Sequence, residues 1–334
     1  MNPRLRQLLL SLGRVAISAG LLAFIVYYVG PGKIFAVARA ADLRLYLLAI
    51  TLVQIGVVVR AYRWLILLRA VGARVSFRRA VYLYFIGSFF NTFLPTGFGG
   101  DVVRVIAVGQ GATSEQAAGT AVVDRLTGFI VLFLLALVAL PFSARLLTPR
   151  LTLLVVVLAG GVVAGSALLF EGRILRWIIR RVAQLPILAG HPRLNRIYGA
   201  VMAWIEKSYG VITACGPRAL AGAMFFSLIF NLLQVGANSL VGTALGITAS
   251  PWVYFLFIPV AAATLLVPAT ISGFGAREAV YILLFGQVHV GSDLATTFSL
   301  SSYFLDFASG VLGGIIYLVS GLLGFRPQQK ATEA

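Results

Sequence analysis

The strongest constraint in this sequence is the length of its apolar stretches. Six of them are long enough to cross the hydrocarbon core of a bilayer, which is about 30 Å thick. We place these predicted spans at residues 11–30, 43–60, 118–140, 151–170, 219–247 and 294–323. Only 11% of the 334 residues are charged, whereas ordinary soluble domains carry about 25%. We therefore expect an all-α, polytopic integral membrane bundle, because helices satisfy their own backbone hydrogen bonds in lipid.

The chain is also strongly basic, with a net charge of +17. Such an excess suits nucleic acid when the basic residues form a stripe that follows phosphates. Here lysine and arginine gather at the ends of apolar runs, where they anchor helices and meet anionic headgroups. The expected partners are therefore anionic phospholipid headgroups at the cytoplasmic face, and nucleic acid is not expected.

The distribution of basic residues between the connecting segments predicts the orientation. The segments assigned to the cytoplasm hold 18 basic residues, and those on the opposite side hold 5. The cytoplasmic set is 1–14, 61–79, 171–218 and the tail after 323, and the opposite set is 31–44 and 141–150. By the positive-inside rule, both termini are predicted to be cytoplasmic, in a bacterial inner membrane.

The long connection 171–218 carries arginines at helical spacing beside apolar residues, as at Arg173, Arg176, Ile174 and Trp177. This pattern is typical of an amphipathic helix that lies in the membrane interface. We therefore expect a cytoplasmic interfacial segment within one integral membrane domain that covers residues 1–334. No second soluble domain is expected.

Two further regions, 80–110 and 252–290, begin as apolar helices and then meet glycine-rich breaks. The first break is Pro-Thr-Gly-Phe-Gly-Gly-Asp at 95–101, and the second is Ile-Ser-Gly-Phe-Gly-Ala-Arg-Glu at 271–278. Proline removes a backbone donor and glycine weakens a helix. Each region is therefore predicted to be a broken, re-entrant hairpin of two half-helices joined by irregular backbone.

The two breaks resemble each other. Thr96–Asp101 aligns with Ser272–Arg277 as hydroxyl, Gly, Phe, Gly, small and charged residue. From the order of the spans, the first hairpin enters from the cytoplasm and the second from the opposite side. Similar breaks that enter from opposite faces are typical of an inverted repeat around a midplane site.

Several ionisable residues lie within or beside the apolar segments, where an isolated charge costs at least a few kcal/mol. They are Asp101, Arg104, Asp124, Arg125, Arg277, Glu278 and Asp306. One explanation is that they neutralise one another. The other is that they line a hydrated cavity and hold a headgroup, since half-helix N-termini and arginines bind phosphate. The presence of both signs favours a zwitterionic or mixed-charge ligand over a bare anion.

The predicted substrate-binding set joins these charges to the polar and glycine residues of the breaks. It is Asn91, Thr96, Gly97, Gly99, Gly100, Asp101, Arg104, Asp124, Arg125, Ser272, Gly273, Gly275, Arg277, Glu278 and Asp306. The glycines are expected to permit irregular backbone. For Arg60 and Arg63, at the end of the second predicted span, an interfacial anchor and a cavity-facing position are both open.

The sequence offers little for metal or cofactor chemistry. Cys215 is the only cysteine, and the two histidines, His191 and His289, lie far apart in the chain. An intramolecular disulfide, a thiolate metal site and a histidine-based triad are therefore not expected. The glycine-rich run at 96–101 lacks the spacing of a dinucleotide or phosphate-binding loop. We expect no cofactor.

Three ordered motifs resemble the lysylphosphatidylglycerol synthase transmembrane region, also called the flippase-like or UPF0104 family. They are the run 90–104, Asp124-Arg125-x-x-Gly128, and the run 272–278. In the synthases, this region is linked to moving aminoacylated phosphatidylglycerol between leaflets, and a separate soluble domain charges the lipid. The longest extramembrane stretch here is too short for such a catalyst, so the resemblance implies the lipid-handling part without the enzyme.

The leading hypothesis is therefore a lipid translocase whose cargo is of the aminoacyl-phospholipid, hopanoid or glycolipid type. A transferase that acts on lipid-linked substrates is the second hypothesis, with Asp101, Asp124 or Glu278 as base or metal ligand. The absence of a DxxD or DxD carboxylate cluster counts against it. An accessory scaffold for other lipid enzymes is the third. The lipid, the direction, the energy source and a homo-oligomeric state stay open.

Overall fold

The structure is a computed structural model, which describes residues 42–93, 99–143, 147–171, 177, 209–211, 213–263 and 276–322. Within these ranges, every regular element is a helix and no strand occurs, which confirms the all-α prediction. The longest elements are α3 (Leu43–Ala70), α6 (Ser114–Ser143), α7 (Pro149–Glu171), α11 (Gly216–Ala244) and α14 (Ser292–Leu322). The shorter ones are α4 (Phe77–Phe93), α5 (Gly99–Ala107), the 3-10 turn η1 (Gly109–Gly111), α12 (Pro251–Ala263) and α13 (Ala276–Gly286).

Five helices are long and apolar enough to cross a membrane, namely α3, α6, α7, α11 and α14. They correspond to five of the six predicted spans, and the sixth, 11–30, lies outside the described residues. The polytopic prediction is therefore confirmed. Most of the predicted interfacial connection 171–218 also lies outside the described residues, so it stays a prediction.

Helix α3 extends beyond the second predicted span. The second span was expected to end at residue 60, but α3 continues to Ala70. Arg63, which was counted among the cytoplasmic residues of segment 61–79, is only 3% exposed. Arg63 is tolerated inside the helix because it makes an ion pair with Asp124. Pairing of this kind offsets part of the cost of burying a charge.

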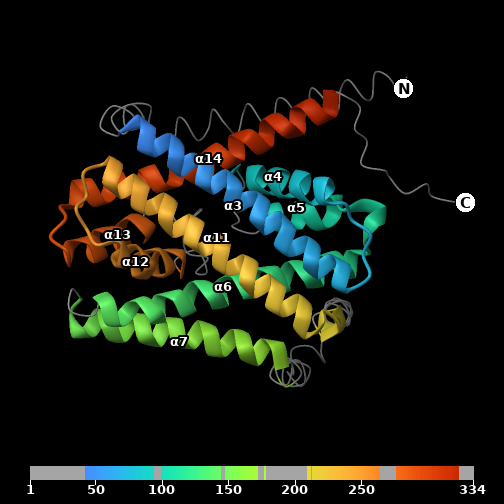
Figure 1. The fold of residues 1–334 in the computed structure, drawn as a ribbon, viewed down its shortest axis with the longest axis horizontal. Helices are drawn as coiled ribbons and strands as arrows, with labels where there is room; N and C mark the ends of the chain where they lie inside the picture. The colour runs from blue at the N-terminus through green and yellow to red at the C-terminus, as the bar shows by residue number, and fades with distance from the viewer. Residues whose placement is uncertain are drawn as a thin grey trace, which may run out of the picture.

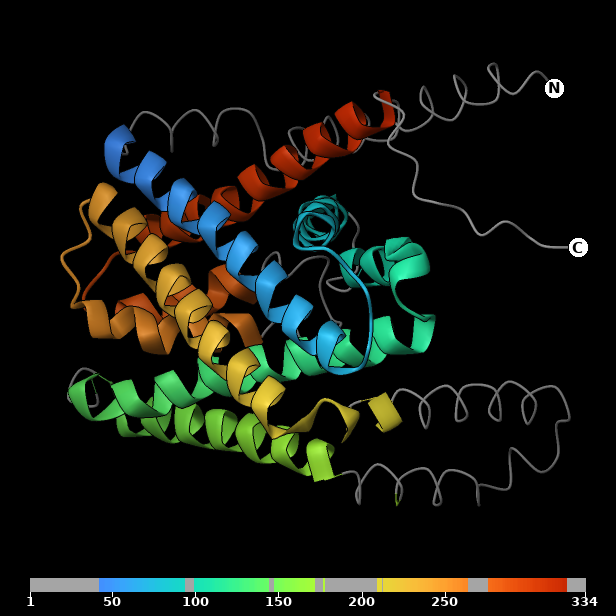
Figure 2. The same ribbon diagram turned by 45° about the vertical axis from the view of Figure 1, so that its right-hand side comes forward.

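The long helices lie in pairs (Figure 1). Helices α3 and α11 run side by side, and so do α6 and α7, while α14 packs against α4. The second view keeps these pairs together and shows α5 beside α4 (Figure 2). Segments that are far apart in the sequence therefore meet in the same part of the bundle, and α3 contacts α4, α6, α11 and α14.

Both broken regions have a helix on each side of the break. Helix α4 ends at Phe93 and α5 begins at Gly99, while α12 ends at Ala263 and α13 begins at Ala276. The two helices of each pair pack against each other, as the two arms of a hairpin do. The breaks themselves, 94–98 and 264–275, lie outside the described residues. Their irregular backbone and the inverted relation of the two hairpins therefore stay predictions.

Gly99 and Gly100 begin helix α5, and Gly100 has a packing role that the sequence did not predict. Both are part of helix α5 and both are buried. A Cβ at Gly100 would collide with the backbone carbonyl oxygen of Gly87 in α4. The Gly100 amide also donates to Asn91 Oδ1 at 2.7 Å. Glycine is therefore needed here for the close approach of two helices rather than for irregular backbone.

The two larger of three apolar clusters among the described residues hold most of the helices in place. One gathers aromatic rings from α12, α13 and α14, where the Phe285 and Phe298 ring centroids lie 4.9 Å apart. The other centres on α3 and α4, where the Trp64 and Tyr84 rings meet edge to face at 5.9 Å. Contacts between aromatic rings in this geometry stabilise a core beyond their buried area. The clusters thus fix the helices that carry the polar residues.

The contact between α14 and α4 should be sensitive to a single methyl group. A Cβ at Gly313 would collide with the carbonyl oxygen of Phe85, so we expect Gly313→Ala to destabilise the protein by about 1–3 kcal/mol. Thermal unfolding of the purified protein in detergent, followed by intrinsic tryptophan fluorescence, measures the effect. The control is Gly161→Ala in α7, where a Cβ meets nothing within 4 Å. Equal melting temperatures for the two variants would contradict this packing account.

Candidate functional site

A cavity of about 330 Å³ lies among helices α3, α4, α5, α6, α11, α13 and α14. Seven of the predicted site residues line it, namely Asn91, Asp101, Arg104, Asp124, Arg125, Arg277 and Asp306. Its volume falls in the range of small-molecule sites, which hold about 300–1,000 Å³. The structure therefore brings together charges that lie up to about 200 positions apart in the sequence.

The other predicted site residues do not line the cavity or lie outside the described residues. Gly99 and Gly100 are buried in α5, and Glu278 accepts a hydrogen bond from Ser299 Oγ at 3.1 Å instead of lining the cavity. The residues of the breaks, Thr96, Gly97, Ser272, Gly273 and Gly275, lie outside the described part of the chain.

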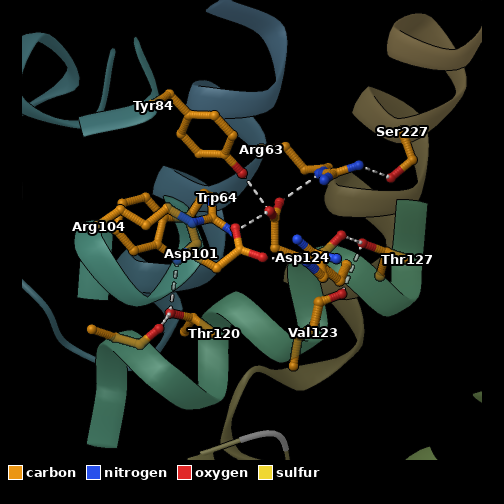
Figure 3. A network of polar contacts seen from close by, with 12 residues as sticks. Arg63, Trp64, Tyr84, Asp101, Arg104, Thr120, Val123, Asp124, Thr127 and Ser227 are labelled. Atoms are coloured by element: carbon orange, nitrogen blue, oxygen red, sulfur yellow. Dashed lines mark hydrogen bonds and ion pairs between the residues drawn. The ribbon is translucent and has the colours of Figure 1, made fainter. Parts of the chain in front are cut away.

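The centre of the polar network is Asp124 on α6, which is 1% exposed. Its Oδ1 accepts from Arg63 Nε of α3 at 2.6 Å. Its Oδ2 accepts from Arg104 Nη2 of α5 at 3.1 Å and from the Tyr84 hydroxyl of α4. Figure 3 shows these three side chains pointing toward the carboxylate, with Ser227 of α11 beyond Arg63. Since Arg63 Nη1 donates to Ser227 Oγ at 2.9 Å, one carboxylate connects side chains from five helices.

Asp101 extends the network toward the cavity. Its Oδ1 lies 3.0 Å from Arg104 Nη2, one turn along α5, and its Oδ2 accepts from Arg125 Nε. Charges of opposite sign therefore alternate from Arg63 through Asp124, Arg104 and Asp101 to Arg125. We call these five residues the ion-pair chain. The first three are nearly inaccessible, whereas the side chains of Asp101 and Arg125 are 16% and 28% exposed.

Aromatic rings hold two of the arginines. The Arg104 guanidinium carbon lies 4.8 Å from the Trp64 ring centroid and 4.4 Å from that of Tyr84. The Arg60 guanidinium lies 5.3 Å from the Tyr84 ring and 5.1 Å from the Phe230 ring. An aromatic face attracts a cation through the ring quadrupole. The rings therefore keep Arg60 in place although it makes no ion pair with any described residue.

On the α13–α14 side, the charges are arranged differently. Arg277 Nη2 donates to the Ser299 carbonyl oxygen at 3.0 Å, and its guanidinium lies 5.5 Å from the Tyr303 ring centroid. Asp306 lines the same cavity, and its side chain is accessible there. Within the described part of the chain, neither Arg277 nor Asp306 makes an ion pair. Arg60, Arg277 and Asp306 form what we call the open charge set.

Sequence reasoning missed several members of the site. It left Arg63 undecided and did not propose Tyr84 or Ser227. A signal existed for Arg63, because apolar residues continue after it through Leu65–Leu68, which places it inside a helix rather than at its end. No pattern in the sequence distinguishes Tyr84 from a tyrosine that only packs.

The helices and the cavity define a multi-pass membrane protein with a charged site inside its helical bundle. The sequence profile described as "Lysylphosphatidylglycerol synthase TM region" matches residues 11–314. The chain therefore belongs to this family, as the three motifs predicted.

Two similar proteins are both named as UPF0104 membrane proteins. One, from Pyrococcus horikoshii, is 27% identical over 325 residues, which cover 91% of this chain and 95% of that protein. The other, from Methanothermobacter thermautotrophicus, is 25% identical over 309 residues, which cover 88% of this chain and 90% of the relative. No solved structure matches the chain.

Loss of the Asp124 charge should destabilise the bundle. In Asp124→Asn, Arg63 loses its carboxylate partner and Arg104 loses one of two, while both guanidinium groups stay buried. Breaking a buried ion pair costs about 3–5 kcal/mol. We expect a lower melting temperature and less monodisperse protein in size-exclusion chromatography. Asp293→Asn is the matched control, because Asp293 is an exposed residue in the first turn of α14. Equal melting temperatures for the two variants would mean that Asp124 does not organise the network.

Proposed function

We propose that this protein moves a polar-headgroup lipid between the two leaflets of its membrane. The headgroup passes through the cavity while the lipid tails stay in the surrounding hydrocarbon. The observation that carries the proposal is the convergence of charged side chains from α3, α5, α6, α13 and α14 on one cavity. Charges at membrane depth are costly, and they are typical of a path for a polar substrate.

The dimensions of the cavity support a headgroup as its occupant. About 330 Å³ accommodates a phosphate with its polar substituent, whereas the tails of the lipid need apolar surface. The outer faces of the long helices provide such surface, with exposed residues such as Leu47, Leu153, Phe225 and Ile315. Membership of the lysylphosphatidylglycerol synthase family supports a lipid-related role. Aminoacyl-phospholipids, hopanoid-linked lipids and glycolipids are the classes of cargo to compare.

We propose different roles for two of the arginines than the sequence suggested. Arg104 was predicted as a headgroup contact, but it is 2% exposed and binds both Asp101 and Asp124. We assign it to the wall of the cavity. Arg277 stays a proposed headgroup contact, and Arg60 joins it, because its guanidinium lines the cavity without a carboxylate partner among the described residues.

The geometry disfavours Asp101 and Asp124 as general bases of a transferase. A general base needs a carboxylate that is available to accept a proton from the substrate. Asp101 and Asp124 each accept from two or more donors in the ion-pair chain and Tyr84. Their oxygens are therefore occupied by the hydrogen bonds and ion pairs of the cavity wall.

We place the protein in the cytoplasmic membrane with both termini in the cytoplasm, in line with the distribution of basic residues.

Reconstitution into vesicles with acyl-labelled fluorescent lipids tests the proposal. A membrane-impermeant quencher measures how fast the labelled lipid leaves the inner leaflet, and empty vesicles give the background rate. We expect Arg277→Ala to slow the movement about tenfold or more, because a hydrogen bond to a charged group contributes about 1.5–3 kcal/mol. Arg150→Ala, at an exposed position at the start of α7, should keep the wild-type rate.

Two results would refute the proposal. One is a wild-type rate equal to that of empty vesicles for every lipid class. The other is an unchanged rate for Arg277→Ala, which would mean that the lipid does not pass through this cavity.

Mass spectrometry of lipids from a deletion strain separates transport from synthesis. A missing lipid product would support a transferase, whereas an unchanged total with an altered leaflet distribution supports translocation.

A further inference from the structure

The charge balance of the cavity narrows the class of cargo, and this inference rests on the proposed function. The lining residues include five arginines and three aspartates, an excess of two positive charges. The arginines are Arg60, Arg63, Arg104, Arg125 and Arg277, and the aspartates are Asp101, Asp124 and Asp306. Such an excess disfavours a cationic ligand, because like charges repel and the repulsion is stronger inside a protein than in bulk water.

The ion pairs show which charges remain to meet a ligand. In the ion-pair chain, three arginines share the carboxylates of Asp101 and Asp124. Both carboxylates are therefore neutralised by the protein itself. An ammonium group of a ligand would have to compete with guanidinium groups that are already in contact. Asp306 is the one aspartate of the cavity lining that makes no ion pair with a described residue.

Among the described residues, no other carboxylate lines the cavity. Glu278 faces Ser299 and is not part of the cavity lining. The breaks 94–98 and 264–275, which lie outside the described residues, contain no charged side chain in the sequence.

The open charge set keeps its guanidinium groups available for an anion. Arg60 is held by the Tyr84 and Phe230 rings, and Arg277 by the Ser299 carbonyl oxygen and the Tyr303 ring. These contacts use only one N–H donor of Arg277 and none of Arg60 among the described hydrogen bonds. A guanidinium has five donors in a planar fork that matches phosphate.

We propose that the cavity selects a lipid headgroup of net negative charge, a phosphate that no ammonium group balances, and that Arg60 and Arg277 bind it. Asp306 opposes this anion and limits how tightly it is held. The sign of the charges argues against the zwitterionic ligand expected from the sequence, because two of the three carboxylates are engaged by arginines. Substitution of Asp306 and of the two arginines should therefore have opposite effects.

The test compares four acyl-labelled lipids with native headgroups in the same vesicle assay. Phosphatidic acid and phosphatidylglycerol are anionic, phosphatidylethanolamine is zwitterionic, and lysyl-phosphatidylglycerol carries a net positive charge. We expect the wild-type protein to move the two anionic lipids about tenfold faster than the other two, which corresponds to about 1.4 kcal/mol of discrimination. Each lipid is also measured in empty vesicles.

Substitutions in the open charge set test whether these residues determine the preference for anionic lipids. Asp306→Asn should lower the concentration of anionic lipid needed for half-maximal rate, because a repelling charge is removed. Arg60→Gln and Arg277→Gln should raise that concentration and reduce the preference for anionic lipids. The matched controls are Asp293→Asn and Arg150→Gln, which change charge at exposed positions outside the cavity. Both controls should keep the wild-type preference.

The possible outcomes separate the two proposals. If the wild-type protein moves lipids but prefers the zwitterionic or cationic ones, the charge inference is overturned and the translocase proposal stands. If Asp306→Asn slows anionic and zwitterionic lipids equally, Asp306 does not act by repulsion, which also overturns it. If no lipid moves, and inorganic phosphate alone raises the melting temperature, the cavity binds a soluble anion and both proposals fail.

Discussion

The buried carboxylate of Asp124 is the contact on which the polar half of this bundle depends. It lies on α6 and accepts hydrogen bonds from α3, α4 and α5 at the same time. Hydrocarbon offers no partner for a guanidinium, so Arg63 and Arg104 can stay buried only where a carboxylate meets them. The position of Asp124 thus determines how four helices approach one another, and Arg63 adds α11 through Ser227.

This arrangement separates two kinds of charge. The ion-pair chain forms a wall whose charges are satisfied by protein groups, and aromatic rings complete the surroundings of Arg104. The open charge set is positioned by rings and a carbonyl oxygen instead, so its members line the cavity without pairing with one another. A site with an ion-paired wall and a few unpaired charges is suited to a polar ligand that enters and leaves.

The sequence predicted most, but not all, of the charges that line the cavity, because an isolated charge in an apolar segment is costly. Asp101, Arg104, Asp124, Arg277 and Asp306 were all selected on this ground, and all line one cavity. The pairing itself was not predictable, since it depends on the distance between helices rather than on spacing along them.

Glu278 shows the limit of a sequence motif. It follows Arg277 directly, and neighbouring residues of a helix point about 100° apart, so only Arg277 lines the cavity. Gly100 shows a second limit. Its position beside a break predicted irregular backbone, whereas its neighbour Gly87 in α4 explains the need for glycine. A contact between two helices, such as that of Gly87 with Gly100, leaves no local pattern in the amino-acid sequence.

The central claim is that a water-accessible cavity exists inside the bundle at membrane depth. Cysteine accessibility tests it most directly, in a Cys215→Ser background without other cysteines. Gln234 lines the cavity, whereas Leu232, two residues earlier on α11, is 45% exposed on the outer surface. With the protein in lipid vesicles, a charged thiol reagent should label Gln234→Cys and spare Leu232→Cys. Labelling of Leu232→Cys alone, or of neither, would contradict the account.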